Sequence, residues 1–176
     1  LKKVMTERLR DGMRSELNSR VRPWDKMLVV LPGTESRSNS AVMIPDGRTD
    51  IQLMLIEVFV RTQEHDPHAI IECKRITGSD RHLCREYVVE GVDRFRTGKY
   101  GQNHAVGFMV GYLLSGTAVD AADGVNAYLT RCSRKAEHLK PDHICEEAPS
   151  WESQHARSVS SSSIRLHHAF LGIAYM

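Results

Sequence analysis

The stretch that decides the fold is residues 48–76, which read RTDIQLMLIEVFVRTQEHDPHAIIECKRI. It holds two apolar runs, and we expect each to form a strand, over residues 49–60 and 68–76. Side chains alternate between the two faces of a strand, so Glu72 and Lys74 share one face. Asp50 opens the first run. An aspartate on one strand and Glu-x-Lys on the next is a layout suited to metal-assisted hydrolysis of phosphodiesters.

The segments on either side of this pair alternate between helical and strand-like patterns. Before the two central strands, we expect a helix over 1–20, strands over 27–31 and 41–44, and a turn at 45–47. After them, we expect a helix from Ser79 or Asp80 to Gly98, a strand over 104–114 and a helix over 117–132. The chain then continues with a polar irregular stretch over 133–150 and a hairpin of strands 151–157 and 164–173 around the serine tract 160–163.

This order predicts an α/β fold in which helices flank a mixed central sheet. We expect a single domain over residues 1–176, with a core over about 1–132 and a C-terminal extension over 133–176 that carries the hairpin. A chain of 176 residues with 41% hydrophobic content is large enough to bury one core.

The amino-acid composition indicates which compartment and which binding partners this chain can have. The 24 basic and 22 acidic side chains give a net charge of +2, so any nucleic-acid surface has to be local. The four cysteines form no CxxC pair, which favours a reducing, cytoplasmic compartment. The longest uncharged apolar run, residues 105–114, is shorter than the roughly 20 residues that span a bilayer, so we expect no membrane partner. There is no Walker-type loop to bind a nucleotide triphosphate.

The acidic residues have the chemistry of a Mg²⁺ site. Mg²⁺ prefers oxygen ligands, which Asp50, Glu72 and the backbone carbonyl of Cys73 would supply. Lys74 would orient the attacking water and offset charge on the phosphate. Asp50 faces Glu72 if the intervening turn is centred on Arg61, but the turn-like residues 63–67 lie later; a bulge would reconcile the two. Otherwise Glu57 is the rival first acid.

Asp50, followed after 21 residues by Glu72-x-Lys74 at the end of an apolar strand, resembles the PD-(D/E)xK, or restriction-endonuclease-like, nuclease superfamily. The resemblance covers about residues 1–115, although Thr49 replaces the usual proline before Asp50. It implies a restriction-endonuclease-like sheet, metal ligation by Asp50 and Glu72, catalysis by Lys74, and Mg²⁺ as cofactor with Mn²⁺ able to substitute. It further implies an added acid from the first helix, Glu16 or Glu7, and a polar side chain at Gln102.

Basic and aromatic residues after the motif are candidates for contact with nucleic-acid phosphates, and an ordinary polar helix face is the alternative reading. The candidates are Arg75, Arg94, Lys99 and Tyr100.

Two other clusters carry weaker patterns. A polar segment contains zinc-ligand residue types whose spacing matches no familiar zinc finger, so a plain loop is favoured. These residues are Cys132, His138, His143 and Cys145. The final hairpin carries His155, Arg157, His167 and His168. Phosphate binding and an interface are the alternatives for this group, and we interpret its members as ordinary surface residues.

The function that this sequence predicts is a metal-dependent DNA endonuclease in restriction, repair or anti-phage defence. Its near-neutral charge suggests that a homodimer or a partner subunit completes its DNA affinity. The alternative is a catalytically silent nuclease-fold domain that serves nucleic-acid binding or assembly.

Overall fold

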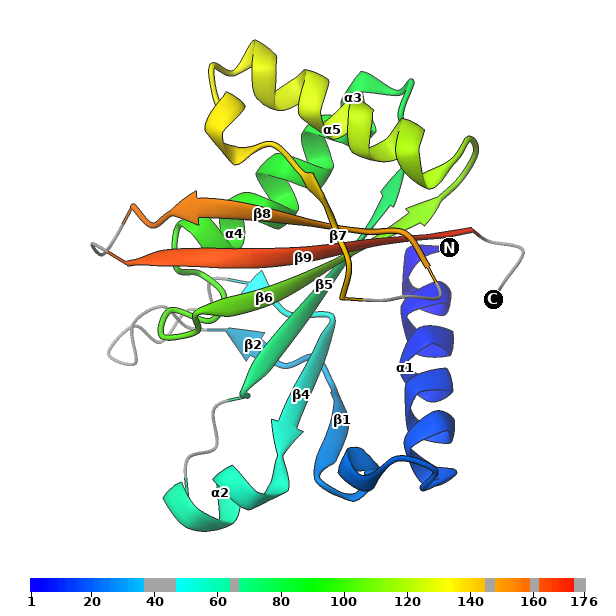
Figure 1. The fold of residues 1–176 in the computed structure, drawn as a ribbon, viewed down its shortest axis with the longest axis vertical. Coiled ribbons are helices and arrows are strands. Elements are labelled where there is room, and N and C mark those ends of the chain that lie inside the picture. Colours follow the sequence, from blue (N-terminus) through cyan, green and yellow to red (C-terminus); the bar gives the residue numbers. More distant parts are fainter. Residues whose placement is uncertain (37–46, 64–66, 145–147, 159–161, 173–176) are drawn as a thin grey trace.

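The computed structural model describes residues 1–36, 47–63, 67–144, 148–158 and 162–172. Its main feature is a mixed seven-stranded sheet with helices on both sides (Figure 1). The strands, in their order across the sheet, are β1 (Leu28–Pro32), β4 (Ile51–Leu55), β5 (Ala69–Ile76), β6 (Val106–Leu113), β9 (Ser163–Gly172), β8 (Ser150–Ala156) and β7 (Lys140–Asp142). A separate two-stranded ribbon pairs β2 (Glu35–Ser36) with β3 (Gly47–Arg48). The predicted α/β class with a mixed sheet is confirmed.

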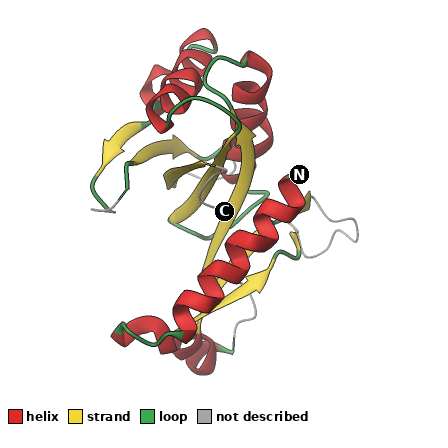
Figure 2. Cartoon of the chain, turned by 90° about the vertical axis from the view of Figure 1, so that its right-hand side faces the viewer, coloured by secondary structure: helices red, strands yellow, loops and turns green. Residues whose placement is uncertain are grey.

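The helices divide between two layers. The α-helices are α1 (Lys2–Asn18), α2 (Ile56–Thr62), α3 (Arg81–Tyr87), α4 (Asp93–Arg96) and α5 (Ala118–Arg131). The π-helical turn η2 (Val88–Val92) joins α3 to α4, and the 3-10 turns are η1 (Pro23–Lys26) and η3 (Lys135–Glu137). Figure 2 shows α1 as the long helix crossing in front of the sheet, apart from the α3–α5 layer. Two hydrophobic cores result, one under each layer.

Helix α1 packs through the apolar stripe that its sequence predicts. Met5 is buried, and Leu9, Met13 and Leu17 follow it at helical spacing against Ile51 and its neighbours in the sheet. The first turn of α1 is therefore held close to the central strands (Figure 1).

The central strands β1, β4 and β5 are antiparallel neighbours. The prediction of a strand over 49–60 is wrong beyond Leu55, where the chain turns into α2. Leu55 already pairs with Leu28, the first residue of β1, so a longer strand would have no partner on that side. A short apolar run does not by itself distinguish a strand from a helix.

The register of β4 against β5 shows whether Asp50 faces Glu72. Ile51 pairs with Ile71, so the next position along brings Asp50 alongside Glu72. The connection is centred near Arg61 and includes α2, so no bulge is needed to bring the two acids together.

The segment after β5 follows the prediction. Asp80 caps α3 by accepting the backbone N–H groups of His82 and Leu83, and Gly98 ends the helical region with φ of 78°. Strand β6 then lies parallel to β5. A Cβ at Gly91 in η2 would lie 2.5 Å from the side chain of Met109 and 3.5 Å from Lys74, so this glycine allows the helix to approach the motif strand closely.

The predicted C-terminal hairpin is confirmed as β8 and β9, and it belongs to the central sheet, because β9 pairs in parallel with β6. The prediction that residues 133–150 are irregular is wrong in part, since they include η3 and β7. The interpretation of the hairpin histidines as surface residues is also wrong: His155 and His168 are buried, as is Arg157, because alternate residues of this hairpin face the α3–α5 layer.

Several predictions fall outside the described residues: the strand over 41–44, most of the turn at 45–47, half of the serine tract, and Cys145. In the part of the chain that the structure describes, no helix combines the length and apolarity needed to cross a bilayer.

Arg157 fastens the end of β8 to the rest of the molecule. Its guanidinium donates to the backbone carbonyls of Phe95 (3.2 Å), Gly101 (2.7 Å) and His104 (2.6 Å). We expect Arg157→Met to lower the free energy of unfolding by about 3 kcal/mol, because it leaves buried carbonyl groups without donors. Urea unfolding followed by circular dichroism measures this. Arg165→Met, on the exposed side of β9, is the control and should change stability by less than about 0.5 kcal/mol. Equal effects of the two substitutions would contradict the anchoring role.

Candidate functional site

The three residues of the predicted motif meet where the β4–β5 ladder ends. Asp50 precedes β4, and its Oδ2 accepts the backbone N–H of Cys73 at 2.8 Å. Lys74 extends from the same face of β5 as Glu72, and its Nζ lies 2.5 Å from Glu72 Oε1. The Nζ of Lys2 lies 2.7 Å from Asp50 Oδ2 and 3.8 Å from Glu72 Oε1, so both carboxylates border one ammonium group. The sequence prediction that Asp50, Glu72 and Lys74 come together is confirmed.

Glu72 is the unusual group of this site because it is an acid with only 1% of its surface exposed. Burial raises the pKa of its carboxyl from 4.5 to about 7; Lys74 opposes that rise and the nearby Asp50 adds to it. Its Oε2 is buried and has no hydrogen-bond partner in the described part of the chain. A buried acceptor without a donor is unfavourable, and a cation bound there would satisfy it.

Cys73 contributes through its backbone. Its side chain is fully buried on the α1 side of the sheet, and burial raises the pKa of the thiol to about 12. The thiol lies on the face of β5 opposite to Glu72, away from the two acids. The prediction that its carbonyl binds a metal stays a prediction.

Arg94 and Tyr100 form a second group beside the acids. Arg94 donates to the Tyr100 hydroxyl and, at 3.1 Å, to Glu90. Tyr100 donates to the carbonyl of Arg48 at 2.7 Å. Burial raises the pKa of Tyr100 to about 12, with the negative charge of Glu72 contributing. Because Tyr100 is fully buried, its ring has no exposed face for a nucleic acid; it positions Arg94 instead.

The further acids and the glutamine predicted for the site lie elsewhere. Glu16 is in the last turn of α1, paired with Arg22 at 3.2 Å, and about 20 Å along the helix axis from Lys2. Glu7 lies five residues beyond Lys2 and so faces another side of α1. Glu57 is in α2, beyond the end of β4 opposite to Asp50, and Gln102 is exposed in the turn before β6. Sequence spacing does not determine which end of a helix meets the site.

The two remaining basic candidates are both exposed. Arg75 lies on β5 next to Lys74 and therefore on the opposite face of the strand, away from Glu72. Lys99 lies in the turn that follows α4. Of the three basic residues predicted to contact phosphates, Arg94 is the one that the fold brings beside the acids.

Lys2 is the site residue that sequence reasoning missed. The sequence feature that points to it is helical spacing: Lys2 lies three residues before the buried Met5 and therefore on the sheet-facing side of α1. A basic residue at the end of an apolar stripe is placed to meet an acid at the edge of the core.

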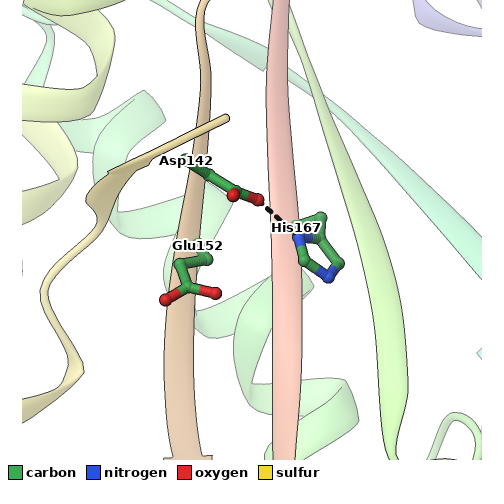
Figure 3. Close-up of side chains that lie close together, drawn as sticks. All are labelled: Asp142, Glu152 and His167. Carbon is green, nitrogen blue, oxygen red and sulfur yellow. Dashed lines mark hydrogen bonds and ion pairs between the residues drawn. The ribbon is translucent and has the colours of Figure 1, made fainter. Parts of the chain in front are cut away.

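A second cluster with metal-ligand residue types comes from β7, β8 and β9 (Figure 3). One ligand atom from each of Asp142, Glu152 and His167 lies within 4.8 Å of the others. His167 Nδ1 is 2.8 Å from Asp142 Oδ2, and Glu152, 42% exposed at its side chain, lies 3.9 Å from Arg165. These contacts account for the cluster without an ion, so the buried Glu72 site is the stronger candidate.

A buried chain of hydrogen bonds joins the C-terminal hairpin to η3 and α3. Glu137 bonds His155, Ser153 Oγ lies 2.6 Å from His155 and 2.7 Å from His168, and His168 lies 3.0 Å from the Tyr87 hydroxyl. Glu137, His155 and Ser153 match the residue types of a hydrolase triad, yet Ser153 is 4% exposed and His155 is fully buried. We interpret the chain as structural.

The segment with zinc-ligand residue types does not form a centre among the described residues. Cys132 is exposed, and His138 lies 2.9 Å from the Thr130 hydroxyl, while Cys145 falls outside the described ranges.

No protein-family model, curated protein or solved structure matches this chain. The function therefore has to be argued from the geometry of the site.

Glu72 makes the stability of the fold depend on pH. The folded state keeps a proton on Glu72 up to about pH 7, whereas the unfolded chain releases it near pH 4.5. Glu72 therefore contributes stability below pH 4.5 that is lost as the pH rises through 7. In EDTA, we expect Glu72→Gln to gain about 2–3 kcal/mol of stability over the unaltered protein between pH 4.5 and 8. Urea unfolding across this pH range measures the difference.

Glu90→Gln is the matched control for this measurement. The hydrogen bond from Arg94 lowers the pKa of Glu90, so its substitution should not add stability as the pH rises. If the free energy of unfolding depends on pH in the same way for the unaltered protein and for Glu72→Gln, the pKa of Glu72 is not raised by burial and this prediction is wrong.

Proposed function

We propose that this chain is a divalent-metal-dependent nuclease of the PD-(D/E)xK superfamily that hydrolyses DNA phosphodiester bonds. The observation that carries the proposal is the buried Glu72 carboxylate, which has one oxygen without a partner, Lys74 on its other oxygen, and Asp50 beside it. A fold rarely buries an acid in this state unless a cation or a reaction uses it.

The order of elements supports the same superfamily. Of the strands that follow helix α1, β1, β4 and β5 are antiparallel neighbours, with Asp50 just before β4 and with Glu72 and Lys74 on β5. Helix α3 and the parallel strand β6 come next. This order agrees with the one that the resemblance implies for the core, and it supports the proposal.

The ligands fit a hard cation. Asp50 and Glu72 would supply carboxylate oxygens and Cys73 its carbonyl, a donor set suited to Mg²⁺, with Mn²⁺ as a substitute. When bound, the ion activates a water and polarises the scissile phosphate. Lys74 is placed to orient that water through its ammonium hydrogens. Arg94, held by Glu90 and Tyr100, would offset negative charge on the phosphate.

The substrate and setting follow from local charge. The net charge of +2 offers little overall attraction for DNA, so binding would rest on Lys2, Lys74 and Arg94 and on a second copy or a partner subunit. An endonuclease in restriction, repair or anti-phage defence, working in the cytoplasm, fits these features.

A catalytically silent domain of the same fold, used for nucleic-acid binding or assembly, is the second candidate. The observation in its favour is the ion pair of Lys2 with Asp50, which already neutralises one of the two acids.

A plasmid-nicking assay separates the two candidates. We expect the chain to nick supercoiled DNA with Mg²⁺ or Mn²⁺ and not with EDTA. Asp50→Asn, Glu72→Gln and Lys74→Met should each slow nicking by about a hundredfold or more, because each removes a group that acts on the reacting phosphate. Circular dichroism checks that the variants are folded.

Arg75→Met is the matched control, since Arg75 neighbours Lys74 on the opposite face of β5 and its loss should leave the metal dependence of nicking intact. Cleavage of RNA alone would change the substrate class. Intact DNA and RNA under every metal condition would favour the silent domain.

A further inference from the structure

We propose that the Lys2 ammonium occupies the cation position between Asp50 and Glu72, and that a divalent ion binds by displacing it. The inference rests on the proposed metal site, and it adds a residue from outside the motif that sets how tightly the site takes metal.

The position of Lys2 is fixed by the first turn of α1. Met5 is 3% exposed in the core under this helix, and the Tyr112 hydroxyl on β6 donates to the Thr6 hydroxyl at 3.2 Å. These contacts hold the N-terminal end of α1 over the sheet, so the backbone of Lys2 is fixed at a position from which its side chain reaches the two acids. Its side chain is 33% exposed, which leaves a route out to solvent.

Lys2 places its ammonium group beside both of the acids that are proposed to hold the metal. Its Nζ lies 2.7 Å from Asp50 Oδ2 and 3.8 Å from Glu72 Oε1. Lys74 approaches Glu72 Oε1 as well, but no ion pair between Lys74 and Asp50 is found among the described residues. Lys2 is therefore the cation that both carboxylates share.

Charge balance explains why such a cation is needed. When both are ionised, Asp50 and Glu72 repel each other across the end of the β4–β5 ladder, and Lys74 forms an ion pair only with Glu72. Lys2 supplies the second positive charge, which lets the two acids stay close before a metal arrives. An ion of charge +2 that took this position would repel both ammonium groups, and Lys2, the more exposed of the two, is the one free to move out.

Calorimetric titration of the full chain with Mn²⁺ tests this competition. We expect Lys2→Met to bind Mn²⁺ about tenfold more tightly than the unaltered protein, because the ion no longer breaks an ion pair that is part-buried. Lys3→Met is the matched control: it removes the same charge from the next, exposed residue, and it should change the affinity much less.

Ionic strength separates local competition from a general effect of charge. Salt screens a long-range charge effect, but it screens a part-buried ion pair in contact much less, so the gain in affinity of Lys2→Met should persist at high salt. If the gain disappears at high salt, Lys2 acts only through long-range charge and the inference is wrong.

A second readout uses the unaltered protein and so does not depend on a variant folding. Acetic anhydride modifies exposed lysine amines, and peptide mass spectrometry reports each site. We expect acetylation of Lys2, relative to Lys3, to rise severalfold when Mn²⁺ is added, since the displaced amine leaves its ion pair. An unchanged or lower ratio would overturn the inference.

These outcomes are distinguishable from failure of the proposed function. If nicking requires Asp50, Glu72 and Lys74 while Lys2→Met binds Mn²⁺ no more tightly, the nuclease proposal stands and the role of Lys2 is wrong. If neither the unaltered protein nor Lys2→Met binds Mn²⁺, both proposals fail.

Discussion

The register of β4 against β5 is the constraint on which the site depends. Pairing of Ile51 with Ile71 brings Asp50 beside Glu72 at the point where β4 begins. Asp50 then accepts the Cys73 N–H, a group at the end of the ladder that would otherwise need another acceptor. A slip by one residue would turn every side chain of β4 to the other face and move Asp50 away from Glu72. Packing of the apolar residues of β4 under α1 therefore fixes the position of the Asp50 carboxylate, although Asp50 is not part of that core.

The layer of α3, η2 and α4 turns this register into an unusual chemical environment. Gly91 allows η2 to approach Lys74 and Met109, and the helical layer removes Glu72 from water. Removing a carboxylate from water disfavours its charged form, so the fold tolerates Glu72 only with cations close by. Lys74 comes from the same strand as Glu72, and Lys2 comes from α1 on the other side of the sheet. Both helical layers therefore contribute to the environment of the Glu72 carboxylate. Sites that carry out chemistry are often less stable than the rest of their fold for this reason.

The sequence predicted what local patterns determine. Asp50, Glu72 and Lys74 were found because strand alternation and the spacing of two runs are local properties, and the Asp80 cap was found from its residue type. Features that depend on tertiary contacts were missed. Helix α2 replaces a predicted strand because β1 offers no partner past Leu28, and Glu16 was expected at the site because a sequence does not show which end of α1 meets the sheet. His168 was read as a surface residue because histidine is often exposed, yet it lies in a buried hydrogen-bond chain.

Two clusters in this fold have the residue types of a cation site, and comparing them shows why residue type alone is a weak criterion. Asp142 is already engaged by His167 and by the His143 backbone, and Glu152 is half exposed beside Arg165. Their polar groups are satisfied by protein or by water, so an ion would have to replace existing interactions without relieving any unfavourable one. At Glu72 one oxygen is buried and without a donor, and the neighbouring acid is held by a lysine that has a route to solvent. There an ion would satisfy the orphan oxygen and release a partly exposed lysine. The difference between the clusters is therefore the unmet interaction at Glu72, and this is the physical reason for placing the proposed chemistry at the end of the β4–β5 ladder.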